Sequence, residues 1–314
     1  MKANHIGHII MKKLYMNFTQ MQSFLALAET RSFTEAAFTL DLTQSAISHA
    51  LAALEQELGV TLVERSRSKS VVALTGVGEK ILPHVRLLLA QAEAITQEAR
   101  AAARGRVQGR VRLGNVPSIV APGLLAKLLT RLRSQYPEIE VVLFEGTMRE
   151  VGEWIENGTV DVGFVVMDAP EFVNVHVATD ELSVLVPSDH PFQARGAVSA
   201  QDLRAEGFIL ERNQCSLQLM AKAGLIDKAA PPQIRYRASD SATILAMVRE
   251  GLGITIMPHQ TLPAHLDGVV VLPLDPPSPL EIGLAYKSSE TISPGTRLLV
   301  EVATAREAFV TSHI

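Results

Sequence analysis

"LTQSAISHALAALEQELG" (residues 42–59) decides the fold of the N-terminal part of this 314-residue chain. Its apolar residues recur at steps of four, three and four, at Ile47, Leu51, Leu54 and Leu58. This spacing predicts a helix with one buried face, which Thr43 can cap and Gly59 can end. The small polar residues at positions 44, 45, 48 and 49 fall outside that face. The question is what so shallow a polar surface does.

Two helical patterns precede this stretch. Apolar residues recur at helical spacing from Phe18 to about Thr30. Ser32, with Glu35 three residues later, is the sequence signature of a capping box and predicts a second, short helix. Two residues then leave room only for a tight turn. Two helices joined by so short a turn are typical of a helix-turn-helix.

The polar surface of the third helix suits the major groove of DNA, because short side chains allow the helix backbone to approach the base edges. Gln44 can pair with adenine. Ser45 and Ser48 can reach bases or phosphates, and His49 can donate to a guanine or a phosphate. The alternative is that these four residues are only the solvated surface of a small helical bundle.

The segment over residues 62–75 predicts a two-stranded wing. Two short apolar runs flank a basic, serine-rich tip, from which Arg65, Arg67 and Lys69 would reach DNA phosphates. Charge supports this only in part, because residues 16–80 hold five basic and seven acidic residues, a net charge of −2. We therefore expect two or more copies to bind DNA together, with a strong contribution from the wing cations.

A long amphipathic helix is predicted over about residues 75–105. Its apolar seam alternates steps of four and three, at Ile81, Val85, Leu88, Ala92, Ile95, Ala99 and Ala102. This is the heptad pattern of paired helices, so the same helix of a second subunit would complete a two-fold dimer. Alternatively, the seam packs on the rest of its own chain. Pro83 predicts a local bend.

From Gly109 onward, strand and helix patterns alternate in two series, which predicts parallel sheets with right-handed crossovers. The strand at 280–287 and the helix from about Pro294 are expected to return to the first sheet. The chain would then cross twice between two α/β lobes, with a ligand cleft between them.

Two residues are candidates for that cleft, and Cys215 is a separate candidate for redox chemistry. Ser118 and Thr147 each follow a strand where a helix begins, so hydroxyls and free helix amides would converge on a small anion such as a carboxylate. Both could equally be plain helix caps. Cys215 lies in a probable turn that enters a helix, whose dipole could lower the pKa of the thiol. It is either a redox-sensitive thiol or an inert residue.

Composition excludes several other classes. No apolar stretch approaches the roughly 20 residues that cross a bilayer, and residues 1–16 lack the pattern of a secretion signal, so we expect a cytoplasmic protein without membrane contact. The single cysteine excludes intramolecular disulfides and Cys-rich zinc sites. The histidines lack metal-ligand spacing, and no phosphate loop, nucleophile elbow or HExxH motif is present. We therefore expect no cofactor, no metal and no catalytic residues.

The stretches "SFTEAAFTLDLTQSAISHALAALEQELGVTLVERS" and "VALTGVGEKILP" closely resemble the N-terminal domain of LysR-type transcriptional regulators, and the resemblance continues more weakly over nearly the whole chain from Met16. It implies an α+β multidomain fold, with an N-terminal winged helix-turn-helix, a long linker helix and a two-lobed α/β effector domain resembling periplasmic binding proteins. The implied parts are an extension at 1–15, a DNA-binding domain at 16–75, a linker and dimerisation helix at 76–105, and an effector-binding domain at 109–314 with lobe I at about 109–180 and 272–314 and lobe II at about 181–271.

The resemblance also implies partners and site residues. The partners are double-stranded promoter DNA, a small-molecule effector and further copies of the chain in a homodimer or homotetramer, with RNA polymerase left open. The DNA-reading positions match Gln44, Ser45, Ser48, His49, Arg65, Arg67 and Lys69. The effector positions match Ser118, Thr147, Ile209, Gly253 and Ile254.

The sequence departs from the family pattern at Ser45, His49 and Val77, which stands where a small residue is commoner, and it lacks a second cysteine. Ser45 stands where proline is frequent and His49 where arginine is frequent, so we expect altered half-site preference and salt dependence. Relatives that sense peroxide near the position of Cys215 usually use two cysteines, and this chain has one.

We therefore predict a transcriptional regulator in which a small carboxylate or other anion held between the lobes changes the bending of promoter DNA rather than simply switching DNA binding on. Two alternatives stay open. One is a redox-responsive regulator acting through Cys215. The other, from a different class, is a solute-binding or enzymatic α/β protein whose N-terminal helices only dimerise.

Overall fold

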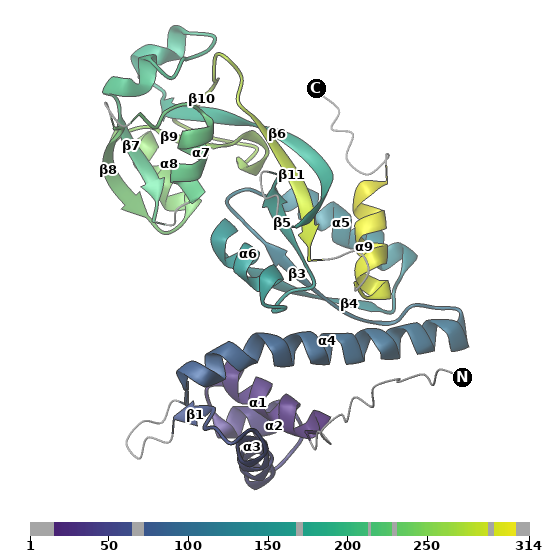
Figure 1. The fold of residues 1–314 in the computed structure, drawn as a ribbon. Coiled ribbons are helices and arrows are strands. Elements are labelled where there is room, and N and C mark those ends of the chain that lie inside the picture. The colour runs from purple at the N-terminus through teal and green to yellow at the C-terminus, as the bar shows by residue number, and fades with distance from the viewer. Residues whose placement is uncertain are drawn as a thin grey trace, which may run out of the picture. The chain divides into compact units, whose positions relative to one another are not determined.

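The computed structural model describes residues 16–64, 72–167, 172–212, 215–227, 231–287 and 292–305. The chain forms two compact units, Met1–Ala92 and Glu93–Ile314. Figure 1 shows the helices and strands of both units. Within the described ranges, no helix is both long and apolar enough to cross a membrane.

Helices and a short hairpin make up the N-terminal unit. Its elements are α1 (Phe18–Thr30), α2 (Phe33–Thr39), α3 (Gln44–Leu58), β1 (Val63–Glu64), β2 (Ala73–Leu74) and the first part of α4 (Gly76–Arg104). The predicted helix-turn-helix is confirmed, with α2 and α3 as its two helices. Ile47, Leu51 and Leu54 are buried as predicted, whereas Leu58 is only half-buried.

Side chains cap the helices of this unit. The Thr43 side chain accepts a hydrogen bond from the Ala46 amide at the start of α3, and Gly59 ends that helix with φ 70°. Ser32 caps α2 by accepting from the Glu35 amide, but the reciprocal bond of the predicted capping box does not form among the described residues. A complete capping box lies instead at α1, between Asn17 and Gln20, where the sequence analysis missed it.

The predicted wing is an antiparallel hairpin at its base. β1 pairs with β2, and Val63 lies opposite Leu74. The basic tip with Arg65, Arg67 and Lys69 lies outside the described residues, as does the extension at 1–15.

The first lobe of the second unit contains the predicted parallel strands, within a mixed sheet that also holds antiparallel strands. Its elements are β3 (Gly109–Asn115), α5 (Pro122–Gln135), β4 (Ile139–Glu145), α6 (Met148–Glu156) and β5 (Val162–Val166). β3 lies between β4 and β5 and runs parallel to both. The C-terminal ends of these strands therefore lie at the edge where α5 and α6 begin.

Strand β6 (Val173–Pro187) is shared by both lobes (Figure 1). Its first part pairs with β11 (Pro279–Tyr286), which also pairs with β5. The second part of β6 pairs with β9 (Thr255–Pro258) and β10 (Val269–Pro273). The predicted return of the closing strand to the first sheet is thus confirmed, and α9 (Pro294–Thr304) follows it.

The second lobe departs from the predicted series of parallel strands. It adds β7 (Gly207–Glu211), α7 (Cys215–Lys222), β8 (Gln233–Ala238), α8 (Ser241–Arg249) and three 3-10 turns, Pro191–Ala194, Asp202–Ala205 and His259–Thr261. β7 and β8 are parallel, but β6 is antiparallel to β9 and β10. The helices α7 and α8 connect β7, β8 and β9, and Phe208 of β7 forms a parallel bridge to Ile254 just before β9. β6 instead enters from the first lobe and runs antiparallel to β9.

Candidate functional site

The polar surface at the start of α3 is open to solvent. Gln44, Ser45, Ser48 and His49 are all exposed, while Ile47 between them is fully buried. The Ser45 hydroxyl lies 3.0 Å from that of Thr43, the cap of the helix. The structure thus brings the four predicted residues together on the first two turns of one helix, where short polar groups and free helix amides are presented together.

The apolar seam of α4 divides into two parts. Ile81 and Val85 pack into the core of the N-terminal unit, so the first part of the seam is covered by its own chain. Leu88 and Ile95 are exposed, at 42% and 70% of their surface. The second part of the seam is therefore an uncovered apolar surface, and α4 continues through Pro83.

Gln97 lies in the part of α4 that belongs to the second unit, and its role there was not predicted from the sequence. Its side chain is buried, with 2% of its surface exposed. Nε2 donates to the Arg110 carbonyl and Oε1 accepts from the Gly295 amide, each at 3.3 Å. The amide therefore joins α4 to the start of β3 and the start of α9. Only its hydrophilic type, at a position that the heptad pattern leaves outside the seam, could have drawn attention to it.

Ser118 and Cys215 meet at a junction between the lobes. Cys215 is the first residue of α7, and its Sγ accepts a hydrogen bond from the Met148 amide of α6 at 3.4 Å. The Ser118 side chain, from the turn after β3, also hydrogen-bonds the thiol. The thiol of the second lobe thus bridges two helix-start segments of the first.

Thr147 lies beside this junction and acts as a helix cap. It forms a complete capping box with Glu150, whose amide donates to the Thr147 hydroxyl at 3.2 Å. In return, the amide and hydroxyl of Thr147 each donate to the Glu150 carboxylate at 2.8 Å. These bonds, the backbone one first, lower the pKa of Glu150. The alternative interpretation of Thr147 as a cap is confirmed, and its contact with a ligand stays a prediction.

Burial controls the chemistry of Cys215. Only 1% of its surface is exposed, and this desolvation raises the pKa of the thiol, although the bonds from Met148 and Ser118 oppose the shift. The expectation that the helix dipole lowers this pKa is therefore wrong, because loss of hydration outweighs the favourable dipoles. The thiol is protonated at neutral pH.

We expect Cys215 to react slowly with alkylating reagents. At pH 7.5, iodoacetamide should modify the folded protein at least about ten times more slowly than a free cysteine, because both access and thiolate fraction are low. Mass spectrometry of the single thiol measures the rate. Unfolding in urea should restore ordinary reactivity, and fast alkylation of the folded chain would contradict this account.

The other predicted effector residues lie in the second lobe. Ile209 in β7 and Ile254 before β9 are fully buried, and the Ile209 amide donates to the Ile254 carbonyl at 2.8 Å. A Cβ on Gly253 would collide with the Gly207 carbonyl, so this position must be glycine for close packing. The structure thus gives these residues a packing role, and effector contact by them stays a prediction.

Comparison with known protein families assigns both parts of the chain. Residues 18–79 match the model of the bacterial regulatory helix-turn-helix proteins of the lysR family. Residues 104–308, well over half of the chain, match the LysR substrate binding domain. The chain belongs to the LysR family. The family prediction and the predicted fold class are thereby confirmed.

Individual LysR relatives match along nearly their whole length. The uncharacterized HTH-type regulator YvbU of Bacillus subtilis is 33% identical over 296 residues, which cover 92% of this chain and 98% of YvbU. The DNA-binding transcriptional dual regulator OxyR of Escherichia coli K12 is 28% identical over 296 residues, with 93% and 96% covered. A structure of a full-length OxyR variant from Pseudomonas aeruginosa has a TM-score of 0.73 at 24% identity, covering 92% and 98%, and shows the same fold.

This LysR-family chain is therefore a DNA-binding transcriptional regulator with an effector-binding domain of the kind that responds to small molecules. The interpretation of the N-terminal helices as only a dimerisation module loses its support, because they match the family's helix-turn-helix.

Proposed function

We propose that this regulator reads double-stranded operator DNA with Gln44, Ser45, Ser48 and His49. The observation that carries the proposal is the exposure of all four side chains on the first turns of α3, above the buried Ile47. A helix with short polar groups at its start can lie close to the base edges of the major groove. Arg65, Arg67 and Lys69 of the wing would add phosphate contacts.

The proposed assembly is a pair of chains joined through residues 76–105, with residues 16–75 on the DNA. Two features support it. Leu88 and Ile95 leave an apolar surface on α4 uncovered, and the net charge of −2 over residues 16–80 makes one copy a weak DNA ligand. A homodimer would present two copies of α3 to a palindromic site, and two dimers would form a homotetramer.

The proposed effector acts on residues 109–314. A small anion near Ser118 and Thr147 would compete for the Met148 amide that now holds the Cys215 thiol. Binding would then change the relation of the two lobes and, through the assembly, the spacing of the DNA-binding domains and the bend of the promoter. The protein would act by binding alone, without catalysis, in the cytoplasm where its DNA lies.

The redox alternative through Cys215 stays a prediction. The likeness to OxyR favours it, while the burial and the raised pKa of the thiol disfavour direct oxidation in this conformation. A Cys215→Ser variant whose response to oxidant equals that of the unmodified chain would remove this alternative.

We expect the Gln44→Ala variant to bind operator DNA at least about fivefold more weakly, because one good bidentate contact to a base contributes about 1–3 kcal/mol of discrimination. The operator is a duplex that the full chain selects from a random library. Fluorescence anisotropy then measures the affinity at two salt concentrations, about 50 and about 200 mM. Binding to unselected duplex should change little.

The matched control is Gln56→Ala, because Gln56 is exposed on the same helix but near its other end. It should leave operator affinity unchanged. If the full chain selects no preferred duplex at either salt concentration, or if the two variants lose affinity equally, the proposed reading surface is wrong.

A further inference from the structure

A cavity of about 860 Å³ lies between α6 and α7, and none of the effector residues predicted from the sequence lines it. Its walls come from α6 and β5 of the first lobe, from Phe172 just before β6, from Leu280 in β11, and from α7 of the second lobe. Small-molecule sites in proteins have volumes of about 300–1,000 Å³. The cavity therefore has room for a complete small ligand.

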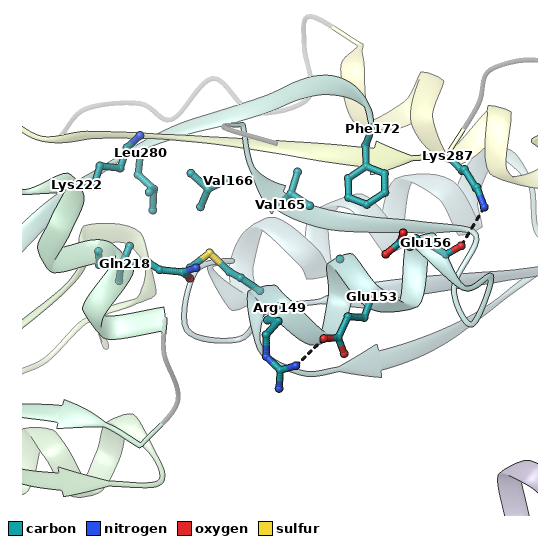
Figure 2. A pocket seen from close by; sticks show the side chains of 13 residues that line it. Arg149, Glu153, Glu156, Val165, Val166, Phe172, Gln218, Lys222, Leu280 and Lys287 are labelled. Atoms are coloured by element: carbon teal, nitrogen blue, oxygen red, sulfur yellow. Dashed lines mark hydrogen bonds and ion pairs between the residues drawn. The ribbon is translucent and has the colours of Figure 1, made fainter. Parts of the chain in front are cut away.

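The interior of the cavity is apolar. Val165, Leu219 and Leu280 are buried side chains that line it, and Val166 and Phe172 are half-buried beside them. Figure 2 shows Val166, Val165 and Phe172 above the charged residues of α6, with Gln218 and Lys222 of α7 at the left. A ligand that fills this space needs an alkyl or aryl body, because a polar body would lose its hydrogen bonds to water without gaining hydrogen bonds to the protein.

Charged side chains surround the interior and carry a small positive excess. The lining holds three cationic residues, Arg149, Lys222 and Lys287, and two carboxylates, Glu153 and Glu156. Arg149 Nη1 pairs with Glu153 Oε1 at 2.5 Å, so these two charges offset each other. Lys287 Nζ donates to the Glu156 backbone carbonyl at 3.1 Å (Figure 2). Among the described residues of the lining, three cations and two carboxylates give a formal charge of +1, which favours one acidic group on the ligand.

We propose that this cavity binds an apolar monocarboxylate, an alkyl or aryl acid with a single negative group. The inference rests on the proposed effector response of residues 109–314 and names the chemical class of the effector, but it places that effector in this cavity and not beside Ser118 and Thr147. Met148 connects the cavity to the lobe junction, since its side chain lines the cavity while its amide holds the Cys215 thiol. A ligand in the cavity thus contacts the residue on which the two lobes meet.

The probes are a series of straight-chain and phenylalkyl acids, hexanoate to decanoate and 3-phenylpropionate to 4-phenylbutyrate, each paired with its neutral amide. Isothermal titration with the full chain measures the dissociation constant. We expect at least one acid to bind, and its amide to bind at least tenfold more weakly. The inference is overturned if no acid in the series binds, or if acid and amide bind equally.

Two glycines provide matched variants that keep the fold. Gly152 lines the cavity on α6, and Gly123 lies on α5 outside it. A Cβ on either meets no atom within 4 Å, and leucine is a better helix former than glycine. Gly152→Leu should weaken the bound acid at least tenfold by occupying the cavity, and Gly123→Leu should leave its affinity unchanged. Equal affinities for both variants would overturn the inference.

Operator binding by the same preparations separates this inference from the proposed function. A chain that binds the acid but selects no DNA sequence would refute the proposed DNA reading and leave the cavity assignment standing. A chain that selects an operator but binds no acid would refute the cavity assignment alone.

Discussion

Gly78→Ala is expected to destabilise the N-terminal unit severely and to abolish operator binding. A Cβ at this position would fall on the backbone carbonyl oxygen of Leu62, which cannot move without displacing β1. Forcing an extra carbon into a packed site costs about 1–3 kcal/mol, and more where the neighbour is backbone. Because a domain of 60–100 residues loses about 4–8 °C per kcal/mol, the unit should unfold roughly 10 °C or more lower.

The neighbouring glycine is the control. Gly76, two residues earlier in the same helix, has no atom within 4 Å of an added Cβ. Gly76→Ala should therefore leave stability unchanged or raise it by up to about 1 kcal/mol. Circular dichroism measures the thermal unfolding of both units. Fluorescence of the single tryptophan, Trp154 on α6, follows only the effector unit.

The fluorescence transition should be the same in both variants. If Gly78→Ala unfolds at the temperature of the unmodified chain, the close approach of α4 to the Leu62 carbonyl does not limit the packing of this unit. A lowered fluorescence transition would instead mean that the change destabilises the whole chain.

The double variant Leu88→Glu, Ile95→Glu is expected to dissociate the assembly. The two side chains are the large exposed apolar groups in the uncovered part of the α4 seam. A fully buried leucine or isoleucine side chain contributes about 1.5–3 kcal/mol. Since a two-fold dimer buries each change twice, the dissociation constant should rise at least about a thousandfold, even before the cost of burying charge.

Sedimentation velocity across a concentration series measures this effect. The control is Arg100→Glu on the same helix, because Arg100 lies about 140° around the helix from Ile95. It should leave the assembly intact. A double variant that sediments like the unmodified chain would show that α4 does not join the subunits.

The helices of the N-terminal unit could be predicted almost to the residue, because their information is local. The steps of the apolar residues after Thr43 and the left-handed position of Gly59 fix α3 without any reference to the rest of the chain. Local information also misled at α2, where the sequence signature predicted both bonds of a capping box. Its sequence signature is present, but the structure forms only the bond from the Glu35 amide to Ser32.

The effector unit was harder to predict, because its decisive contacts join residues far apart in sequence. The pairing of Met148 with Cys215 depends on how two lobes meet, and no periodic pattern encodes it. Burial of the thiol is likewise a tertiary property, so the local helix dipole gave the wrong direction for its pKa. The cavity was missed because its apolar lining reads in sequence as ordinary core.

The place of β11 in the sheet has a consequence for synthesis on the ribosome. β11 pairs with both β5 and β6, yet it is made only from residue 279 onward, after every strand of the second lobe. A nascent chain that stops before this point contains α1 to α4 but lacks the strand that unites the first lobe. Premature termination would then spare the helix that we propose reads DNA and disable the sensor, so a truncated product should interfere with intact copies.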